Sequence, residues 1–179
     1  AVRTPLIVVD PRAPADETRG KSLPQMVQAI DVLPTILEAV GIDRGTWGHI
    51  VEGESLLPLL KGQSVPWRDA VFSEADYAFR EARRILDRQP SECRGTMVRT
   101  ERWKYVEWQG FRPQLFDLKN DPQELNDLGE NPPPDVEREM RDRLLSWSLQ
   151  RKNRTTTSDA EVEEKTEAVK QHGIHIGVW

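Results

Sequence analysis

Short apolar stretches separated by polar turns run through the first part of the chain and predict a mixed α and β fold. The run Leu6-Ile7-Val8-Val9 is apolar on both faces, which is typical of a buried strand in a sheet covered by helices. A strand of this kind needs neighbouring strands, and this segment alone does not supply them all. Asp31 then predicts a helix N-cap, with Pro34 in the first turn. The apolar residues of this helix recur at helical spacing and end before a C′ glycine: Leu33, Ile36, Leu37, Val40 and Gly41.

The pattern changes at Ala70, where apolar and polar residues begin to alternate over short segments. Four strands are predicted, at 70–73, 96–100, 104–108 and 114–118. A helix at about 77–86 separates the first strand from the second. Glu101-Arg102 forms a tight link between the second and third strands, which predicts an antiparallel hairpin.

Two helices are predicted after these strands. Asp121-Pro122-Gln123-Glu124 has the form of a capping box with proline at the first helical position. Asp135 begins the longest helix, and one apolar stripe runs along it: Val136, Met140, Leu144 and Trp147. This stripe is expected to lie on the small sheet, which is an α+β arrangement.

The chain is therefore expected to be α/β overall, with an α+β part after the end of a larger sheet. The predicted division is 1–62, the end of a main α/β domain, then 63–150, a small α+β subdomain, and 151–179, a polar arm. Residues 151–171 hold few large apolar groups and do not build a core. The chain ends on the alternately apolar Ile174–Trp179, and it opens as though cut from a longer protein.

Composition excludes several classes of protein. The net charge of −5 and the absence of a basic stripe argue against nucleic-acid binding. No apolar run approaches the roughly 20 residues that span a bilayer, so no membrane association is expected. The lone Cys93 excludes an internal disulfide framework and favours a reducing, cytoplasmic location.

Four stretches, taken in order, resemble the sulfatase family of the alkaline phosphatase superfamily. They are Arg3–Ile7, then Asp31–Leu37 leading to Gly41, then Gly53–Leu60, and finally Arg102–Tyr105 with Leu115–Leu118 and Asp121–Glu124. Each is weak alone, but their shared order and spacing match the final third of such enzymes. The stretch Trp67–Arg84 and the ending Gly173–Trp179 are most similar to the phosphonate monoester hydrolase branch.

The resemblance implies a longer parent enzyme whose chemistry lies upstream of this chain. Such enzymes use a formylglycine nucleophile, made from Cys or Ser in a Cys/Ser-x-Pro-x-Arg motif, and a divalent metal ion. Both the nucleophile and the metal ligands precede the position that Arg3 matches. The resemblance therefore gives no catalytic, cofactor-binding or metal-binding residue in this chain, and the segment is expected to be inactive alone.

Two local matches to reactive motifs fail in context. Ser64-Val65-Pro66-Trp67-Arg68 fits Ser-x-Pro-x-Arg, but a predicted strand follows it where the family has a helix start and a Thr-Gly pair. The context favours a linker whose tryptophan packs against the sheet. Cys93 is followed by Arg94-Gly95 and fails the motif, which favours a small structural cysteine.

The candidate metal ligands are also incomplete. His172 and His175 are three residues apart, but Gly173 lies between them and no further ligands complete a set. His49 is expected in a turn. The acidic residues Asp117, Asp121, Glu124 and Asp127 lack the order of a calcium loop.

Two functional hypotheses follow. The first is the C-terminal part of a metal-dependent sulfatase or phosphonate or phosphate ester hydrolase, whose partner is the rest of the parent chain. Here Arg80, Arg83 and Arg84 form either an anionic-substrate surface or a solvated helix face. The second is a non-catalytic interaction module that forms a homo-oligomer through 151–179, because the apolar chain end needs a surface to cover it. A tail that folds back on its own domain, or is disordered, remains the alternative.

Overall fold

The structure is a computed structural model of the 179-residue chain, and it describes residues 4–151 and 156–171, the last six as backbone only. The chain divides into two compact units. One contains residues 22–28 and 66–150, and the other contains residues 1–21, 29–65 and 151–179. The three-part division expected from the sequence stays a prediction.

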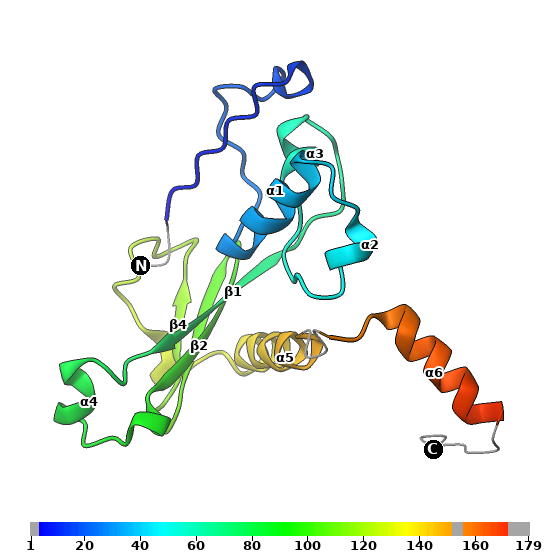
Figure 1. Cartoon of the computed structure of the whole chain (residues 1–179). Helices are drawn as coiled ribbons and strands as arrows, with labels where there is room; N and C mark the ends of the chain where they lie inside the picture. The colour runs from blue at the N-terminus through cyan, green and yellow to red at the C-terminus, as the bar shows by residue number, and fades with distance from the viewer. Residues whose placement is uncertain (1–3, 152–155, 172–179) are drawn as a thin grey trace. The chain divides into compact units, whose positions relative to one another are not determined.

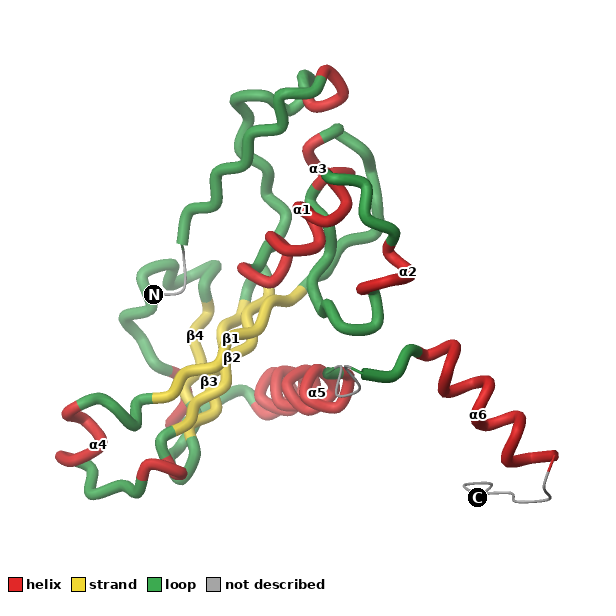
Figure 2. Tube along the Cα trace, viewed as in Figure 1, coloured by secondary structure: helices red, strands yellow, loops and turns green. Residues whose placement is uncertain are grey.

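A four-stranded antiparallel sheet forms the centre of the first unit, here called the sheet unit, in the order β1-β2-β3-β4 (Figures 1 and 2). The strands are β1 (Ala70–Asp76), β2 (Arg94–Thr100), β3 (Trp103–Trp108) and β4 (Gln114–Asp117). Each pairs with the next along the chain, so the sheet is a meander. The predicted four strands and the hairpin between the second and third are confirmed.

Helix α5 (Pro134–Gln150) packs against this sheet through the predicted apolar stripe. Met140 is fully buried and Leu144 is 9% exposed, and both contact a cluster of sheet residues. That cluster consists of Ala70, Val98, Tyr105 and Leu115. The Trp147 ring stacks on Phe72 with centroids 4.9 Å apart. Packing of one apolar helix stripe on one sheet face gives this unit its core.

The second unit, here called the helical unit, is built from helices joined by long connections. They are α1 (Val32–Ala39), α2 (Arg44–Trp47), α3 (Leu57–Leu60) and the later α6 (Asp159–Gln171). α1 buries Pro34 and Thr35, whereas Leu33, Ile36 and Val40 are more than half exposed. Three of the four residues of the predicted stripe are therefore exposed, and Leu37 is half-buried.

Two predicted elements are not formed. Residues 6–9 are not a strand, and Ile7 is 87% exposed, because the described part of the chain provides no neighbouring strand to pair with. The predicted capping box at 121–124 does not start a helix. Glu124 instead adopts a left-handed φ of 58°, and Asp121 accepts a bond from Asn126 N–H, so the segment is a turn.

Two other predictions need correction in detail. Asp31 precedes α1 as expected, but its carboxylate accepts a bond from Glu54 N–H instead of capping its own helix. The helix predicted at 77–86 is limited to α4 (Glu81–Ile85), because residues 77–80 form a turn after β1. Over the residues described, no helix is both long and apolar enough to cross a bilayer.

Candidate functional site

The loop that joins β1 to β2 carries several exposed charged side chains and the fully exposed Phe79. It projects from one end of the sheet and contains α4 (Figure 2). The loop is closed at its base, where Tyr77 N–H donates to the Cys93 carbonyl at 3.0 Å. The Tyr77 ring also meets the edge of Trp108 on β3, at a centroid distance of 6.0 Å. The sheet therefore fixes both ends of this loop.

A second set of contacts holds the C-terminal side of the loop. The Arg88 guanidinium lies over the Phe111 ring at 4.5 Å and donates to the Gly110 carbonyl at 3.1 Å. Asp87 adopts a left-handed φ of 50°, an uncommon conformation for a residue with a side chain. These contacts tie the loop to the turn between β3 and β4, so its outer part extends from a braced base.

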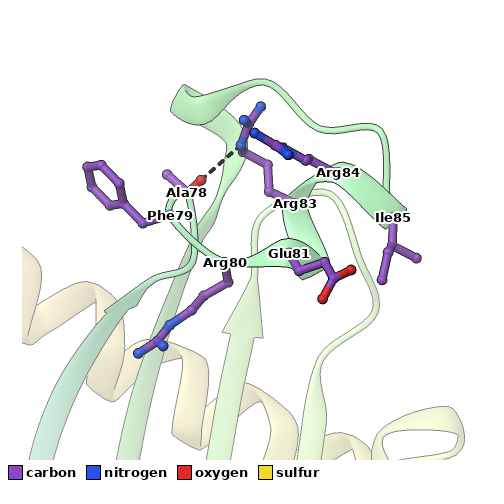
Figure 3. A pocket seen from close by; sticks show the side chains of 7 residues that line it. All are labelled: Ala78, Phe79, Arg80, Glu81, Arg83, Arg84 and Ile85. Atoms are coloured by element: carbon purple, nitrogen blue, oxygen red, sulfur yellow. Dashed lines mark hydrogen bonds between the residues drawn. The ribbon is translucent and has the colours of Figure 1, made fainter.

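The outer part of the loop surrounds an open hollow of about 710 Å³ (Figure 3). Its lining residues are Ala78, Phe79, Arg80, Glu81, Arg83, Arg84 and Ile85. Phe79 is 100% exposed and Ile85 is 76% exposed. Arg83 is half-buried and braces the loop, since it donates to the Ala78 carbonyl at 2.9 Å and to the Arg88 carbonyl at 3.3 Å. Figure 3 shows Arg83 and Arg84 extending to one side of the loop, with Phe79 and Arg80 directed elsewhere.

The loop is basic in an acidic chain. Residues 77–88 contain four arginines and two acidic residues, whereas the chain carries a net charge of −5. Among the described residues, no carboxylate lies within ion-pair distance of Arg80, Arg83 or Arg84. The structure thus places the three arginines that the sequence singled out around one hollow, with Arg80 directed away from Arg83 and Arg84 (Figure 3). The sequence interpretation missed Phe79, although an aromatic residue beside arginine in a turn was the available signal.

Two ionisable side chains, Tyr77 and Cys93, lie at the base of the loop. Burial and the neighbouring Cys93 raise the pKa of Tyr77, so its phenol stays protonated at neutral pH. Cys93 itself is fully buried, and its thiol donates to the Gln89 carbonyl at 3.3 Å. Both side chains belong to the packed base of the loop.

The other candidate residues from the sequence do not form a site. Ser64 is exposed in an irregular segment, and Trp67 donates from its indole N–H to the Met26 carbonyl at 2.8 Å. His49 lies half-buried in a turn. His172 and His175 lie outside the described residues.

The acidic candidates serve as turn and ion-pair residues instead of converging. Asp117 pairs with Arg102 at 2.9 Å, and Asp127 accepts bonds from the Leu115 and Gly129 amides. Within the residues that the structure describes, no three His, Cys, Asp or Glu side chains are placed to hold a metal ion. These residues therefore do not fit a divalent metal ion.

Two of the four sequence stretches form one buried contact. Asp31, which is fully buried, accepts from Glu54 N–H at 2.9 Å, and the Thr35 hydroxyl accepts from Leu56 N–H at 2.9 Å. Gly53 is required at this approach, because a Cβ there would lie 2.1 Å from the Ile30 carbonyl oxygen. These two stretches therefore recur together because the backbone at 53–56 packs against the start of α1.

The last of the four stretches joins β3, β4 and the turn that follows. Arg102 forms its ion pair with Asp117 across the hairpin, and Lys104 pairs with Glu124. The guanidinium of Arg102 holds the pKa of Asp117 below its usual value. These motif residues therefore stabilise the scaffold.

The family of this scaffold follows from a match over most of the chain. Residues 1–150 match the family described as N-sulphoglucosamine sulphohydrolase, C-terminal. The chain belongs to this family. It is thereby a member of the sulfatases of the alkaline phosphatase superfamily, as the ordered stretches predicted.

Individual relatives agree with this membership. The chain is 31% identical over 160 residues to the multifunctional alkaline phosphatase superfamily protein PehA of Trinickia caryophylli, covering 87% of this chain and 30% of the relative. It is 31% identical over 138 residues to mouse arylsulfatase K, covering 72% of this chain and 22% of the relative. This sulfatase-family chain thus spans less than a third of the length of these curated relatives.

The fold also agrees with membership of this family. The structure is similar to the phosphonate monoester hydrolase of Agrobacterium radiobacter, with a TM-score of 0.64 and 31% identity, over 73% of this chain and 26% of that one. The predicted similarity to phosphonate monoester hydrolases is confirmed. The fold class expected from the sequence, the end of an alkaline-phosphatase-like α/β fold with a small antiparallel sheet, is confirmed too.

Proposed function

We propose that this chain is the C-terminal part of a longer metal-dependent hydrolase of sulfate, phosphonate or phosphate esters, and that it is inactive alone. The observation that carries the proposal is the family match over residues 1–150 combined with coverage of only 22–30% of the curated relatives. The nucleophile and the metal ligands of the enzyme belong, in this proposal, to the preceding part of the longer chain.

The exposed apolar surface of the helical unit supports a longer chain. Ile7, Val9 and Val40 are 87%, 74% and 67% exposed, and Ile36 is 54% exposed. Full burial of such a side chain stabilises a protein by roughly 1.5–3 kcal/mol, so exposing several of them together is unfavourable. The upstream part of the same hydrolase is the surface that we expect to cover them.

The metal chemistry is assigned outside the described residues, because those residues offer no ligand set for a divalent ion. In the intact enzyme the metal ion would stabilise negative charge on the transferred group.

Assays of the isolated chain test its inactivity. An aryl sulfate and a phenylphosphonate monoester are incubated with the 179-residue chain, with and without added Mn²⁺. We expect no turnover above the rate without protein. Metal-stimulated turnover by the isolated chain would contradict the proposal, whereas the longer chain should hydrolyse at least one of these esters.

Substitutions in the longer chain test the covered surface. Ile36→Ser should lower the yield of soluble, active enzyme, because it places a hydroxyl in an apolar interface. Leu125→Ser is the matched control, since Leu125 is 81% exposed in a turn of the sheet unit. Equal yields for both variants would count against burial of Ile36.

The second candidate function is assembly through residues 151–179. The apolar end of this segment, Ile174–Trp179, lies outside the described residues, and homo-oligomer formation stays a prediction. The polar sequence before it forms α6, a helix able to present that end to a partner. Truncation after Gln150 should reduce the number of chains per particle, measured as the particle mass in solution divided by the mass of one chain. An unchanged number of chains would remove this candidate. A cytoplasmic location likewise remains a prediction.

A further inference from the structure

We propose that the outer part of the β1–β2 loop, residues 78–85, is a binding site for tetrahedral oxyanions that carry an aromatic or apolar group. The inference deepens the proposed function and rests on it in one respect. Guanidinium groups bind carboxylates, sulfates and phosphates alike, and the hydrolase assignment selects sulfate and phosphonate esters among them.

The charge of the loop provides the first argument. Arg80 and Arg84 are exposed, and together with Arg83 they line a single hollow that no described carboxylate neutralises by an ion pair. Glu81 and Arg84 on α4 are three residues apart but form no ion pair. Oppositely charged residues on a solvated helix face pair at this i,i+3 spacing or at i,i+4. α5 shows that arrangement, with Arg138 paired to Asp135 and Arg143 paired to Glu139. The loop keeps its positive charge available for a ligand.

The bracing of the loop provides the second argument. Arg83 is held by two backbone carbonyls, and the base is fixed by the Tyr77–Cys93 bond and by Arg88 over Phe111. A loop ordered in this way loses less conformational entropy when a ligand binds. Binding residues are found disproportionately on loops that a rigid scaffold positions.

The exposed apolar side chains at the hollow indicate that the ligand carries an apolar group beside its oxyanion. Phe79 has no contact that shields it, at 100% exposure, and Ile85 is 76% exposed at the same hollow. An inorganic anion would leave both in water, whereas an aryl or other apolar group would cover them. A volume of about 710 Å³ lies within the range of small-molecule sites.

Direct binding to the full 179-residue chain tests the site without any need for turnover. Phenyl sulfate and phenylphosphonate are titrated by calorimetry, and the arginine Nε–H signals are followed by NMR; inorganic sulfate and phenol are the comparison ligands. We expect saturable binding of the two aryl oxyanions, shifts at the loop arginines, weaker binding of sulfate and none of phenol. Added salt should weaken the binding.

Variants locate the site. The double variant Arg80→Gln and Arg84→Gln should weaken aryl oxyanion binding by about tenfold or more, because it removes two of the positive charges that line the hollow. Phe79→Ala should weaken phenyl sulfate binding severalfold and leave inorganic sulfate unchanged. Arg138→Gln is the matched control, since it removes one exposed arginine from α5. Arg83 is left intact because it braces the loop.

Three results would overturn the inference. They are no saturable binding up to about 10 mM, equal weakening by the loop double variant and by Arg138→Gln, or binding of an acidic peptide but of no small oxyanion. Because binding is measured apart from turnover, a longer chain without hydrolase activity would refute the proposed function and leave this result standing. Absence of binding would refute the site and leave the hydrolase assignment standing.

Discussion

Two adjacent leucines on α5 allow the packing of the sheet unit to be tested with one chemical change. Leu144 is 9% exposed and belongs to the cluster around Val98 and Tyr105, whereas Leu145 is 60% exposed. Leu→Ala at either position removes the same atoms from the same helix. Differences in helix propensity therefore cancel between the two variants.

The expected magnitude follows from these exposures. Removing an isopropyl group from a fully buried site loses about 2.4 kcal/mol of transfer free energy, at about 0.8 kcal/mol per carbon. The cavity that remains raises the loss for Leu144→Ala to about 3 kcal/mol. Leu145→Ala loses less than half of the transfer term and leaves no cavity, so its cost is about 1 kcal/mol or less.

Urea denaturation followed by circular dichroism measures both free energies of unfolding. We expect the midpoint of Leu144→Ala to fall well below that of Leu145→Ala, with similar slopes, because a change in midpoint at constant slope reports stability. In thermal unfolding, a loss of about 3 kcal/mol corresponds to a decrease of roughly 10 °C or more for a unit of this size. Equal midpoints for the two variants would refute the proposed packing of α5 on the sheet.

Two further predictions concern polar contacts. Gly53→Ala places a methyl group 2.1 Å from a backbone carbonyl oxygen, so the Glu54 amide should lose its bond to Asp31 and exchange with deuterium about tenfold faster or more; unchanged protection in hydrogen-exchange NMR would contradict this contact. Asp117 has a lowered pKa because of Arg102, so its stabilising contribution is present above about pH 4 and is lost as the pH falls through the lower folded-state pKa. The difference in urea midpoint between the native chain and Asp117→Asn should therefore be constant from about pH 5 to 7 and shrink toward pH 3, and a difference that persists at low pH would show that the ion pair is not its source.

The sheet unit could be predicted from the sequence because its elements have local signals. Alternation over short segments identified the strands, and a stripe at helical spacing identified α5 with Met140 and Leu144 in the core. Both partners of that packing lie within 66–150. The apolar pattern of residues 66–150 therefore agrees with their packing in the structure.

The helical unit was harder to predict because its apolar stretches stay largely exposed within the described residues. The apolar run at 6–9 has the composition of a buried strand, but a strand forms only beside another strand. The turn at 121–124 failed for another reason. Its capping-box pattern is local, whereas Glu124 is drawn into an ion pair with Lys104 on β3, and this tertiary contact overrides the helix signal.

The candidate site was only partly visible in the sequence. Three arginines in one short segment were evident, but their separation from carboxylates and the full exposure of Phe79 depend on how the loop is braced. Gly110 and Phe111, which hold Arg88, come from a turn more than twenty residues away. No local pattern records a contact of that range.

The closure of the β1–β2 loop separates the sequence of the loop from the stability of the sheet. A backbone hydrogen bond joins Tyr77 to Cys93 at the mouth of the loop. The residues between them can therefore be replaced together, as one segment. Lengthening or replacing that segment does not change the residues that pair β1 with β2 or those of the core beneath α5, because none of them lies between Tyr77 and Cys93. The charge and shape of the surface at this end of the sheet can therefore diverge while the fold itself is retained.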